Sequence, residues 1–145
     1  NRWFLLGRNE KYETIGNYAL DRIVSFRNVD IPFCKNTQIN FDTYFNDVIG
    51  VTVPKADIET IVLRFSENRF PYVVSKPLHH SQVVNKEQRT VTITVKPNNE
   101  LNQLIFSFIP DVEVLAPYSL REAIKDKIEE NLKKYLSVQN DCTEP

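Results

Sequence analysis

The residues best suited to chemistry stand at the start of the chain. Arg2-Trp3-Phe4-Leu5-Leu6-Gly7-Arg8 sets the only tryptophan of the sequence on an extended segment flanked by arginines. Tyr18-Ala19-Leu20-Asp21-Arg22-Ile23 then places an aspartate and an arginine in an apolar frame. A guanidinium beside an aromatic face stacks bases and holds phosphates. This chemistry is typical of a recognition surface rather than a reaction centre.

Each of these residues also has a structural interpretation. A tryptophan on a strand is usually a core residue because it buries a large apolar area, whereas the arginines beside Trp3 favour a ligand contact. Asp21 and Arg22 are adjacent, so on a strand they point to opposite faces and do not pair simply with each other. We expect one of the two to be structural and the other to face an anion, with an internal salt bridge as the alternative for Arg22.

The motif His79-His80-Ser81 is the other place with residue types found in catalytic sites. Adjacent histidines in an extended segment diverge, so a shared metal ion is not expected. A serine nucleophile needs a bonded histidine, an orienting acid and an oxyanion hole, and this chain of three glycines has no glycine-rich elbow. We expect one packed and one solvated imidazole, no enzymatic activity, no metal and no cofactor.

The composition is that of an ordinary globular protein, with 41% hydrophobic and 26% charged residues among 145. No apolar run approaches the roughly 18 residues that span a bilayer, so no contact with a membrane is expected. The net charge of −1 argues against a main DNA anchor, which should be basic. Two distant cysteines, Cys34 and Cys142, favour a reducing cytoplasm.

The first part of the chain predicts a short sheet and a connector. Residues 3–8 and 14–19 are expected to form strands joined by a polar turn, and residues 20–26 a third strand. Residues 28–56 form the connector, where aromatic side chains at helical spacing predict one short helix ending near Gly50. Because the chain begins with asparagine and enters a strand at once, we expect the C-terminal part of a longer protein.

From Ile58 onward the pattern predicts the order βαββαβ followed by a final helix, which is the ferredoxin-like plait of the α+β class. The expected strands are 58–65, 81–84, 90–95 and 112–115, and the expected helices are 66–75, one opened by Pro97-Asn98-Asn99 and one opened by Pro117-Tyr118-Ser119.

The final helix carries three further signals. Ser119 and Glu122 have the spacing of a capping box. One face of this helix is apolar and is expected to dock on another surface; it comprises Leu120, Ile124, Ile128, Leu132 and Leu136. Glu129 with Lys133 and Glu130 with Lys134 are expected to form i,i+4 pairs on the solvated face.

Together these motifs resemble a known family. Trp3-Phe4-Leu5 followed by Tyr18-Ala19-Leu20-Asp21-Arg22-Ile23 resembles the WYL domain of bacterial transcriptional regulators, with Phe4 in place of the family's tyrosine. Pro77-Leu78-His79-His80-Ser81-Gln82 and Val112-Glu113-Val114-Leu115-Ala116-Pro117 with Leu120-Arg121 resemble the C-terminal extension of such proteins, called WCX. The resemblance covers essentially the whole chain.

The resemblance implies a domain plan. Residues 1–53 would be the C-terminal part of a WYL domain, a partial Sm-like or SH3-type β-barrel, together with the connector. Residues 54–137 would be the WCX plait, and residues 138–145 a flexible tail. Full-length members carry an N-terminal winged helix-turn-helix that contacts DNA.

The resemblance also implies a ligand site. The family's tryptophan and arginine map onto Trp3 and Arg22, and strand spacing places Arg8 and Tyr18 near the same surface. Phe4 lacks the phenolic hydroxyl of the family's tyrosine, and with it any hydrogen bond of that group. The WYL part is thought to sense a nucleic-acid-like or nucleotide-like ligand and to control DNA binding.

We therefore expect a ligand-sensing and interaction module of a cytoplasmic bacterial transcription factor, acting as a homodimer. The main alternative is a purely structural oligomerisation module without a ligand. A small enzyme on a plait fold is the third hypothesis, and the lack of an activated nucleophile argues against it.

Overall fold

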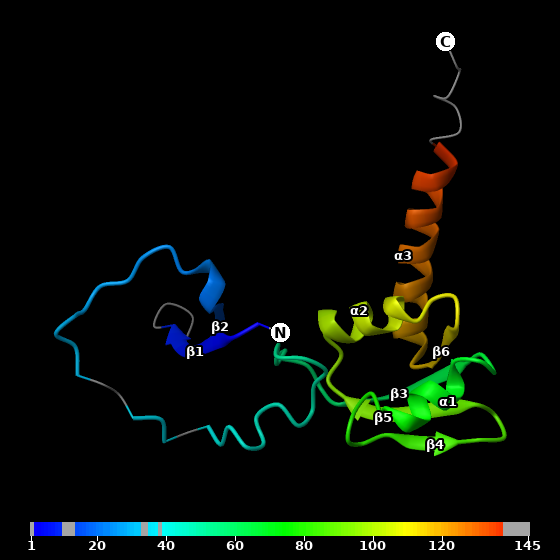
Figure 1. The fold of residues 1–145 in the computed structure, drawn as a ribbon, viewed down its shortest axis with the longest axis horizontal. Helices are drawn as coiled ribbons and strands as arrows, with labels where there is room; N and C mark the ends of the chain where they lie inside the picture. Colours follow the sequence, from blue (N-terminus) through cyan, green and yellow to red (C-terminus); the bar gives the residue numbers. More distant parts are fainter. Residues whose placement is uncertain (1, 10–13, 33–34, 38, 138–145) are drawn as a thin grey trace, which may run out of the picture. The chain divides into compact units, whose positions relative to one another are not determined.

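The structure is a computed structural model that describes residues 2–9, 14–32, 35–37 and 39–137. Residues 10 and 11 of the expected polar turn at 9–11, Cys34, Cys142 and the expected tail at 138–145 lie outside the described residues. The chain divides into two units, Asn1–Asn46 and Asp47–Pro145. In Figure 1 the first unit is drawn in blue and cyan, and the second continues from there to red.

The first unit is built on the two strands that were predicted. β1 (Phe4–Asn9) and β2 (Thr14–Ala19) pair antiparallel, with Phe4 opposite Ala19 and Arg8 opposite Ile15. The described residues of this unit include no buried side chain. A two-stranded hairpin is at best marginally stable by itself. The barrel that the resemblance implies stays a prediction.

The predicted third strand at residues 20–26 is wrong. Leu20–Arg22 form a short 3-10 helix, η1, and residues 23–32 have no regular secondary structure. The cause is local, because the Leu20 amide donates a hydrogen bond to the Trp3 carbonyl oxygen at 3.0 Å as β2 ends. The Ile23 amide then bonds to the Leu20 carbonyl oxygen at 3.3 Å and closes the turn.

The predicted short helix of the connector is also wrong, because residues 41–47 form successive turns. The Asn40 side-chain oxygen accepts from the Asp42 amide at 3.0 Å, and the Asn40 carbonyl oxygen accepts from the Thr43 amide at 3.3 Å. Such local bonds offer the backbone an alternative to the helix. Gly50 has φ +78°, which favours glycine, and a Cβ there would lie 2.8 Å from Cγ of Glu100.

The second unit is an antiparallel sheet with the strand order β4-β5-β3-β6. Its strands are β3 (Glu59–Phe65), β4 (Val83–Asn85), β5 (Thr90–Val95) and β6 (Val112–Ala116), and its helices are α1 (Phe70–Ser75), α2 (Asn99–Ser107) and α3 (Tyr118–Ser137). This strand order and the βαββαβ sequence of elements are those of the ferredoxin-like plait. The predicted fold class of this part is confirmed.

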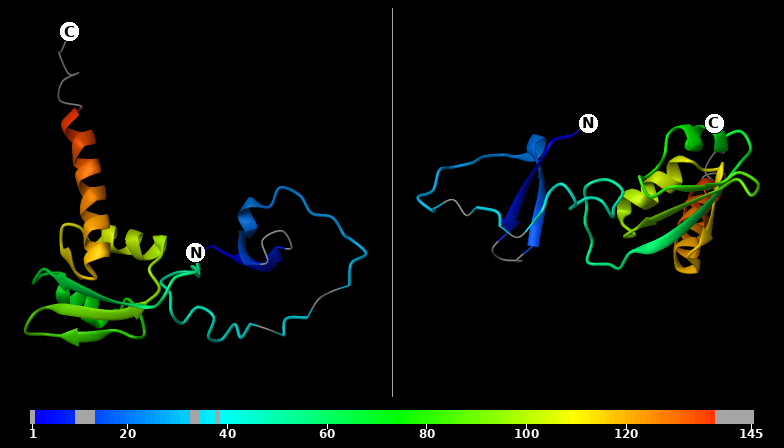
Figure 2. Two further views of the ribbon diagram at one scale, coloured as in Figure 1. Left: turned by 180° about the vertical axis from the view of Figure 1, so that it is seen from behind. Right: turned by 90° about the horizontal axis from the view of Figure 1, so that it is seen from below.

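One face of the sheet carries the core. Along β3 the side chains of Ile61, Leu63 and Phe65 are buried, while the residues between them are not. The same cluster takes Phe70 and Val73 from α1 and Leu101 and Ile105 from α2. All three helices therefore meet one face of the sheet through their buried residues, and Figure 2 shows the helices and the sheet from two further sides.

α1 is shorter than predicted. The expected helix began at Ser66, whereas the observed one begins at Phe70, with Pro71 in its first turn as predicted. The Ser66 hydroxyl instead donates to Asp111 at 2.8 Å and accepts from the Arg69 amide at 3.3 Å. Ser66 thus tightens the turn before the helix, which delays the first helical residue.

α3 begins at Tyr118, so Ser119 lies inside the helix and the predicted capping box is wrong. Glu122 pairs with Lys125 instead, at 3.3 Å. Of the predicted apolar face only Leu120 and Ile124 are buried. The remainder of α3 extends beyond the sheet and α2 (Figures 1 and 2). None of the helices in the described part of the chain is long and apolar enough to cross a bilayer.

Asn98 joins the incoming chain to the plait. Its side-chain oxygen accepts from the Leu101 amide at 2.8 Å and caps α2. Its amide group donates to the carbonyl oxygens of Ile49 and Thr52 at 2.8 and 2.9 Å. Three bonds thus depend on one buried side chain, which fastens residues 49–52 to the start of the helix.

Replacement of Asn98 by alanine should lower the free energy of unfolding of the second unit by about 2 kcal/mol, because it removes the cap and leaves two carbonyl groups unpaired. Urea unfolding followed by far-ultraviolet circular dichroism measures this, since the only tryptophan lies in the first unit. The adjacent, exposed Asn99→Ala is the control and should stay within about 0.5 kcal/mol. Equal losses in both variants would contradict the role given to Asn98.

Candidate functional site

The hairpin positions Tyr18 by leaving space beneath its ring. Tyr18 lies opposite Leu5 on the strand face that also carries Gly7 and Gly16. A Cβ on Gly16 would lie 2.8 Å from the Tyr18 ring, and one on Gly7 would lie 3.5 Å from it. Asn9 donates from its side-chain amide to the Tyr18 hydroxyl at 3.3 Å. The ring is therefore held across the hairpin with its outer surface partly exposed.

A hollow of about 510 Å³ lies where the hairpin meets η1 and the chain after it; we call it the hairpin hollow. Its lining comprises Arg2, Phe4, Asn17, Tyr18, Ala19, Arg22, Ile23, Val24 and Ser25. The lining combines two guanidinium groups, a phenol ring, a phenyl ring, aliphatic side chains and two uncharged polar side chains. A planar ring with an attached anion is the class of ligand that this mixture suits.

The charges around the hairpin hollow are unequally neutralised. Arg2 Nε lies 3.2 Å from a carboxylate oxygen of Asp21, and both side chains are about half exposed. Such an exposed pair contributes at most about 1 kcal/mol. Arg22 makes no ion pair with any described residue. Asp21 thus pairs with Arg2, and the turn at η1 brings Arg22 to the hollow. The predicted strand, which would have placed Asp21 and Arg22 on opposite faces, is absent.

The structure brings together two of the four predicted site residues. Tyr18 and Arg22 both line the hairpin hollow. Trp3 does not line it; its side chain is 81% exposed, so the core interpretation of Trp3 is wrong. Arg8 shares the strand face of Phe4 and extends from the side of the hairpin opposite to Tyr18. The prediction that Arg8 and Tyr18 lie near the same surface is therefore wrong.

Sequence reasoning missed other parts of this lining. The sequence presents Arg2 only as a neighbour of Trp3, and its pattern predicts a strand for Ile23, Val24 and Ser25, whereas all four line the hollow. The position of Arg2 next to the tryptophan was the available signal. The contribution of residues 23–25 depends on the turn at η1, for which the sequence carries no clear signal.

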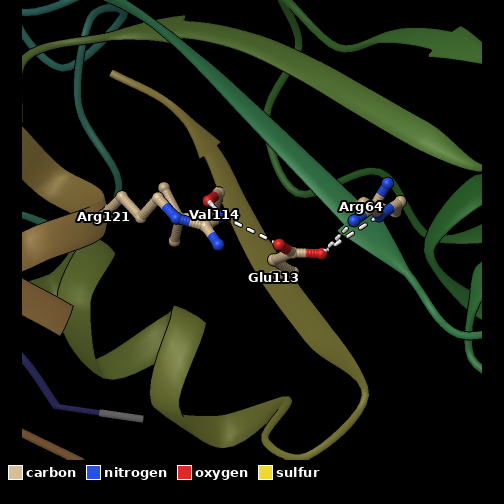
Figure 3. A network of polar contacts seen from close by, with 4 residues as sticks. All are labelled: Arg64, Glu113, Val114 and Arg121. Carbon is tan, nitrogen blue, oxygen red and sulfur yellow. Dashed lines mark hydrogen bonds and ion pairs between the residues drawn. The ribbon is translucent and has the colours of Figure 1, made fainter. Parts of the chain in front are cut away.

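The second unit contains a polar cluster that joins three elements. Figure 3 shows Glu113 of β6 between Arg64 of β3 and Arg121 of α3. Arg64 donates from Nε at 3.1 Å and also from Nη2 to one carboxylate oxygen. Arg121 donates from Nη1 to the other oxygen at 2.8 Å and to the Val114 carbonyl oxygen at 2.6 Å. The carboxylate is thus satisfied by its own protein, and this cluster is a structural link rather than a ligand site.

The two guanidinium groups also set the ionisation of Glu113. Hydrogen bonds from Arg64, and then from Arg121, lower the pKa of the Glu113 carboxyl below its ordinary value. Desolvation acts in the opposite direction and is the smaller effect. The ionised carboxylate is therefore the form that the fold favours.

The His79-His80-Ser81 motif is tied into the sheet. Ser81 Oγ lies 2.7 Å from Nδ1 of His79, accepts from the Thr94 amide at 2.9 Å, and lies 3.4 Å from the Thr94 carbonyl oxygen. The rings of His79 and His80 lie 4.1 Å apart between centroids, so the expected divergence is wrong. His79 is partly buried and His80 is exposed, as predicted. No cluster of three or more metal-ligating side chains occurs among the described residues.

A comparison with models of protein families gives a match that covers the plait. The family model described as WCX domain matches residues 57–132, which include every strand of the second unit and most of α3. No curated protein matches the chain.

Acidification should lower the free energy of unfolding of the second unit by protonating Glu113. Because its folded pKa is lowered, its stabilising contribution is complete above about pH 4.3, the ordinary value for glutamate, and is lost as the pH falls through the lower folded value. Glu113→Gln should reduce the free energy of unfolding at neutral pH by at most about 1 kcal/mol, since the carboxylate is partly exposed.

Urea unfolding at several pH values tests this. The difference between Glu113→Gln and the unchanged protein should shrink as the pH falls below about 4. Glu87→Gln, at an exposed glutamate without an ion pair among the described residues, should show no such dependence. A difference for Glu113→Gln that is constant with pH would assign its effect to packing alone.

Proposed function

Because the chain belongs to the WCX domain family, we propose that it is a ligand-sensing and interaction module of a bacterial DNA-binding transcriptional regulator. WCX domains are commonly associated with WYL-domain regulators. In the proposal the first unit belongs to a WYL domain, and a helix-turn-helix domain of the same cytoplasmic regulator contacts DNA. The family match supports the regulatory role, and the hairpin hollow supports the choice of ligand.

The proposed ligand is nucleotide-like or a short nucleic acid. The observation that carries this proposal is that Arg22 lines the hairpin hollow, without an ion pair among the described residues, beside the ring of Tyr18. Tyr18 would stack on a base, and Arg22 would donate hydrogen bonds to a phosphate. Phe4, Ile23 and Val24 would cover the edge of the bound base.

The two remaining predicted residues receive different roles. Trp3 is held near the site by its carbonyl oxygen, which accepts the hydrogen bond from the Leu20 amide. Its exposed indole would stack on a second base of a longer ligand, and its fluorescence would report binding. Arg8 does not line the hairpin hollow, so we assign it no contact with a ligand there.

The proposal contains no catalytic step. Ser81 Oγ lies 2.7 Å from Nδ1 of His79, but it also accepts a hydrogen bond from the Thr94 amide at 2.9 Å and is thereby tied to the sheet. Binding would instead bias the arrangement of the two units, or of two subunits. A ligand shifts such an equilibrium only by the difference between its affinities for the two states.

Titration of Trp3 fluorescence tests the ligand. Short single-stranded DNA and RNA, and linear and cyclic nucleotides, are added at two salt concentrations. We expect saturable quenching by at least one titrant that weakens with salt. Arg22→Ala should weaken binding about tenfold or more, because a charge-assisted hydrogen bond contributes about 1.5–3 kcal/mol. Arg27→Ala removes the same charge outside the hairpin hollow and is the matched control.

A positioning variant separates stacking from charge. Gly16→Ala places a methyl group against the Tyr18 ring and should weaken binding without removing a group that contacts the ligand. Circular dichroism checks that the hairpin persists. No response to any titrant, or equal weakening by Arg22→Ala and Arg27→Ala, would overturn the assignment of the hairpin hollow.

A second candidate function is subunit association without a ligand. The exposed apolar side chains on the distal part of α3 favour it. In that case sedimentation at several concentrations would detect a dimer whose affinity ignores both Trp3→Ala and Arg22→Ala, and no titrant would quench Trp3.

A further inference from the structure

One of the two arginines in the hairpin hollow already holds an anion of the protein itself. Arg2 Nε lies 3.2 Å from a carboxylate oxygen of Asp21, whereas Arg22 makes no ion pair with any described residue. Both arginines line the hollow, and Asp21 does not. The hollow therefore presents one guanidinium group without a resident anion and one that a carboxylate of the protein neutralises.

The hairpin itself sets the Arg2–Asp21 pair. The register of β1 and β2, continued by two residues, places Arg2 opposite Asp21. The main-chain hydrogen bond between Leu20 and Trp3 holds the two chains at this level. Opposite charges directly across a strand pair attract each other. The next residue, Arg22, belongs to η1 and reaches the same hollow, so the backbone fixes both guanidinium groups at one site.

The other ion pairs between described residues lie outside this hollow, in the second unit. Of the two pairs predicted on the solvated face of α3, Glu130 with Lys134 forms at 3.0 Å. Glu129 and Lys133 form no ion pair with any described residue, so that second prediction is wrong. Within the described part of the chain, only the Arg2–Asp21 pair involves a cation of the hairpin hollow.

A ligand can replace this pair at low cost. The side chains of Arg2 and Asp21 are 48 and 54% exposed, and an exposed ion pair contributes little because water screens it. A phosphate, in contrast, accepts two parallel hydrogen bonds from one guanidinium group. A first phosphate on Arg22 displaces no carboxylate. A second phosphate of the same ligand then competes with Asp21 at a high effective concentration, because the first is already bound.

We propose that the hairpin hollow prefers a ligand with two phosphate groups. Arg22 binds the first phosphate, and Arg2 binds the second after Asp21, the resident counter-ion, is displaced. The inference rests on the ligand class proposed above and adds its specificity, since a ligand with one phosphate leaves the Arg2–Asp21 pair intact. Two kinds of molecule share this chemistry: a nucleoside diphosphate, and a short strand with a phosphate at its 5′ end.

Isothermal titration calorimetry of the full chain with two matched pairs of ligands tests the preference. The first pair is adenosine monophosphate and adenosine diphosphate, and the second is the dinucleotide ApA without and with a 5′ phosphate. In at least one pair the member with two phosphates should bind about tenfold more tightly, because it gains charge-assisted hydrogen bonds from Arg2. The pair that shows the preference identifies the source of the second phosphate.

A charge-neutral double variant tests the role of the pair. Arg2→Ala with Asp21→Asn leaves the net charge unchanged, so the affinity for the one-phosphate ligands should stay within about twofold while the preference for two phosphates is lost. Asp21→Asn alone should strengthen binding of the preferred two-phosphate ligand up to about fivefold, because the competing carboxylate is gone. Lys134→Ala with Glu130→Gln removes an exposed ion pair outside the hollow and is the matched control.

The outcomes separate this inference from the proposed function. Equal affinities within both ligand pairs, or a preference that the Arg2/Asp21 double variant and its control reduce equally, would overturn the two-phosphate site and leave the ligand-binding role of the hollow standing. No binding of any of these ligands or of the longer strands would overturn both. Circular dichroism checks that each variant keeps the hairpin. Should the double variant lose it, Asp21→Asn decides alone, because unchanged or weaker binding of the two-phosphate ligand would contradict the displacement of Asp21.

Discussion

The fold of the second unit depends on its central strand, β3, which pairs with a neighbouring strand on each side. β3 pairs with β5 on one side and β6 on the other, so the sheet is continuous only through it. Ile61, Leu63 and Phe65 enter the core and hold the helices against one face. Arg64, between Leu63 and Phe65, points away from that core and binds Glu113, whose other oxygen binds Arg121 of α3. A single strand thus supplies apolar contacts to the helices and, through Glu113, a polar link to the base of α3.

The described residues of the first unit include no buried side chain, and this explains where its functional groups lie. The described part of the hairpin is held by main-chain pairing, the Leu20–Trp3 hydrogen bond and the packing of Tyr18 over Gly7 and Gly16. Aromatic and guanidinium groups in this unit therefore remain partly exposed. Binding residues are commonly carried by such surface segments and positioned by a more rigid scaffold, whereas the buried side chains of the plait serve packing.

The sequence predicted the plait well because its signals are local and repeated. The alternation along β3 and β5, and the spacing of Leu101 and Ile105 in α2, each specify an element over several residues. The predictions that are wrong concern segments whose structure is set by single hydrogen bonds. The Asn40 hydrogen bonds replaced the connector helix, and the Leu20–Trp3 bond replaced the third strand. The same turn decides the candidate site: Tyr18 and Arg22 were predicted, while Arg2 and residues 23–25 join them only because the chain turns at η1.

The two proposed functions lie in different units, and this constrains how they can be linked. The hairpin hollow belongs to Asn1–Asn46, whereas α3 belongs to Asp47–Pro145. The hollow is lined by residues of the first unit alone, so we expect any effect of its ligand on association through α3 to pass through an arrangement of the units that differs between monomer and dimer. Linkage is then reciprocal: if the ligand tightens the dimer by some factor, dimerisation must tighten ligand binding by the same factor. Equal ligand affinity in monomer and dimer would mean that sensing and association are independent properties of the chain.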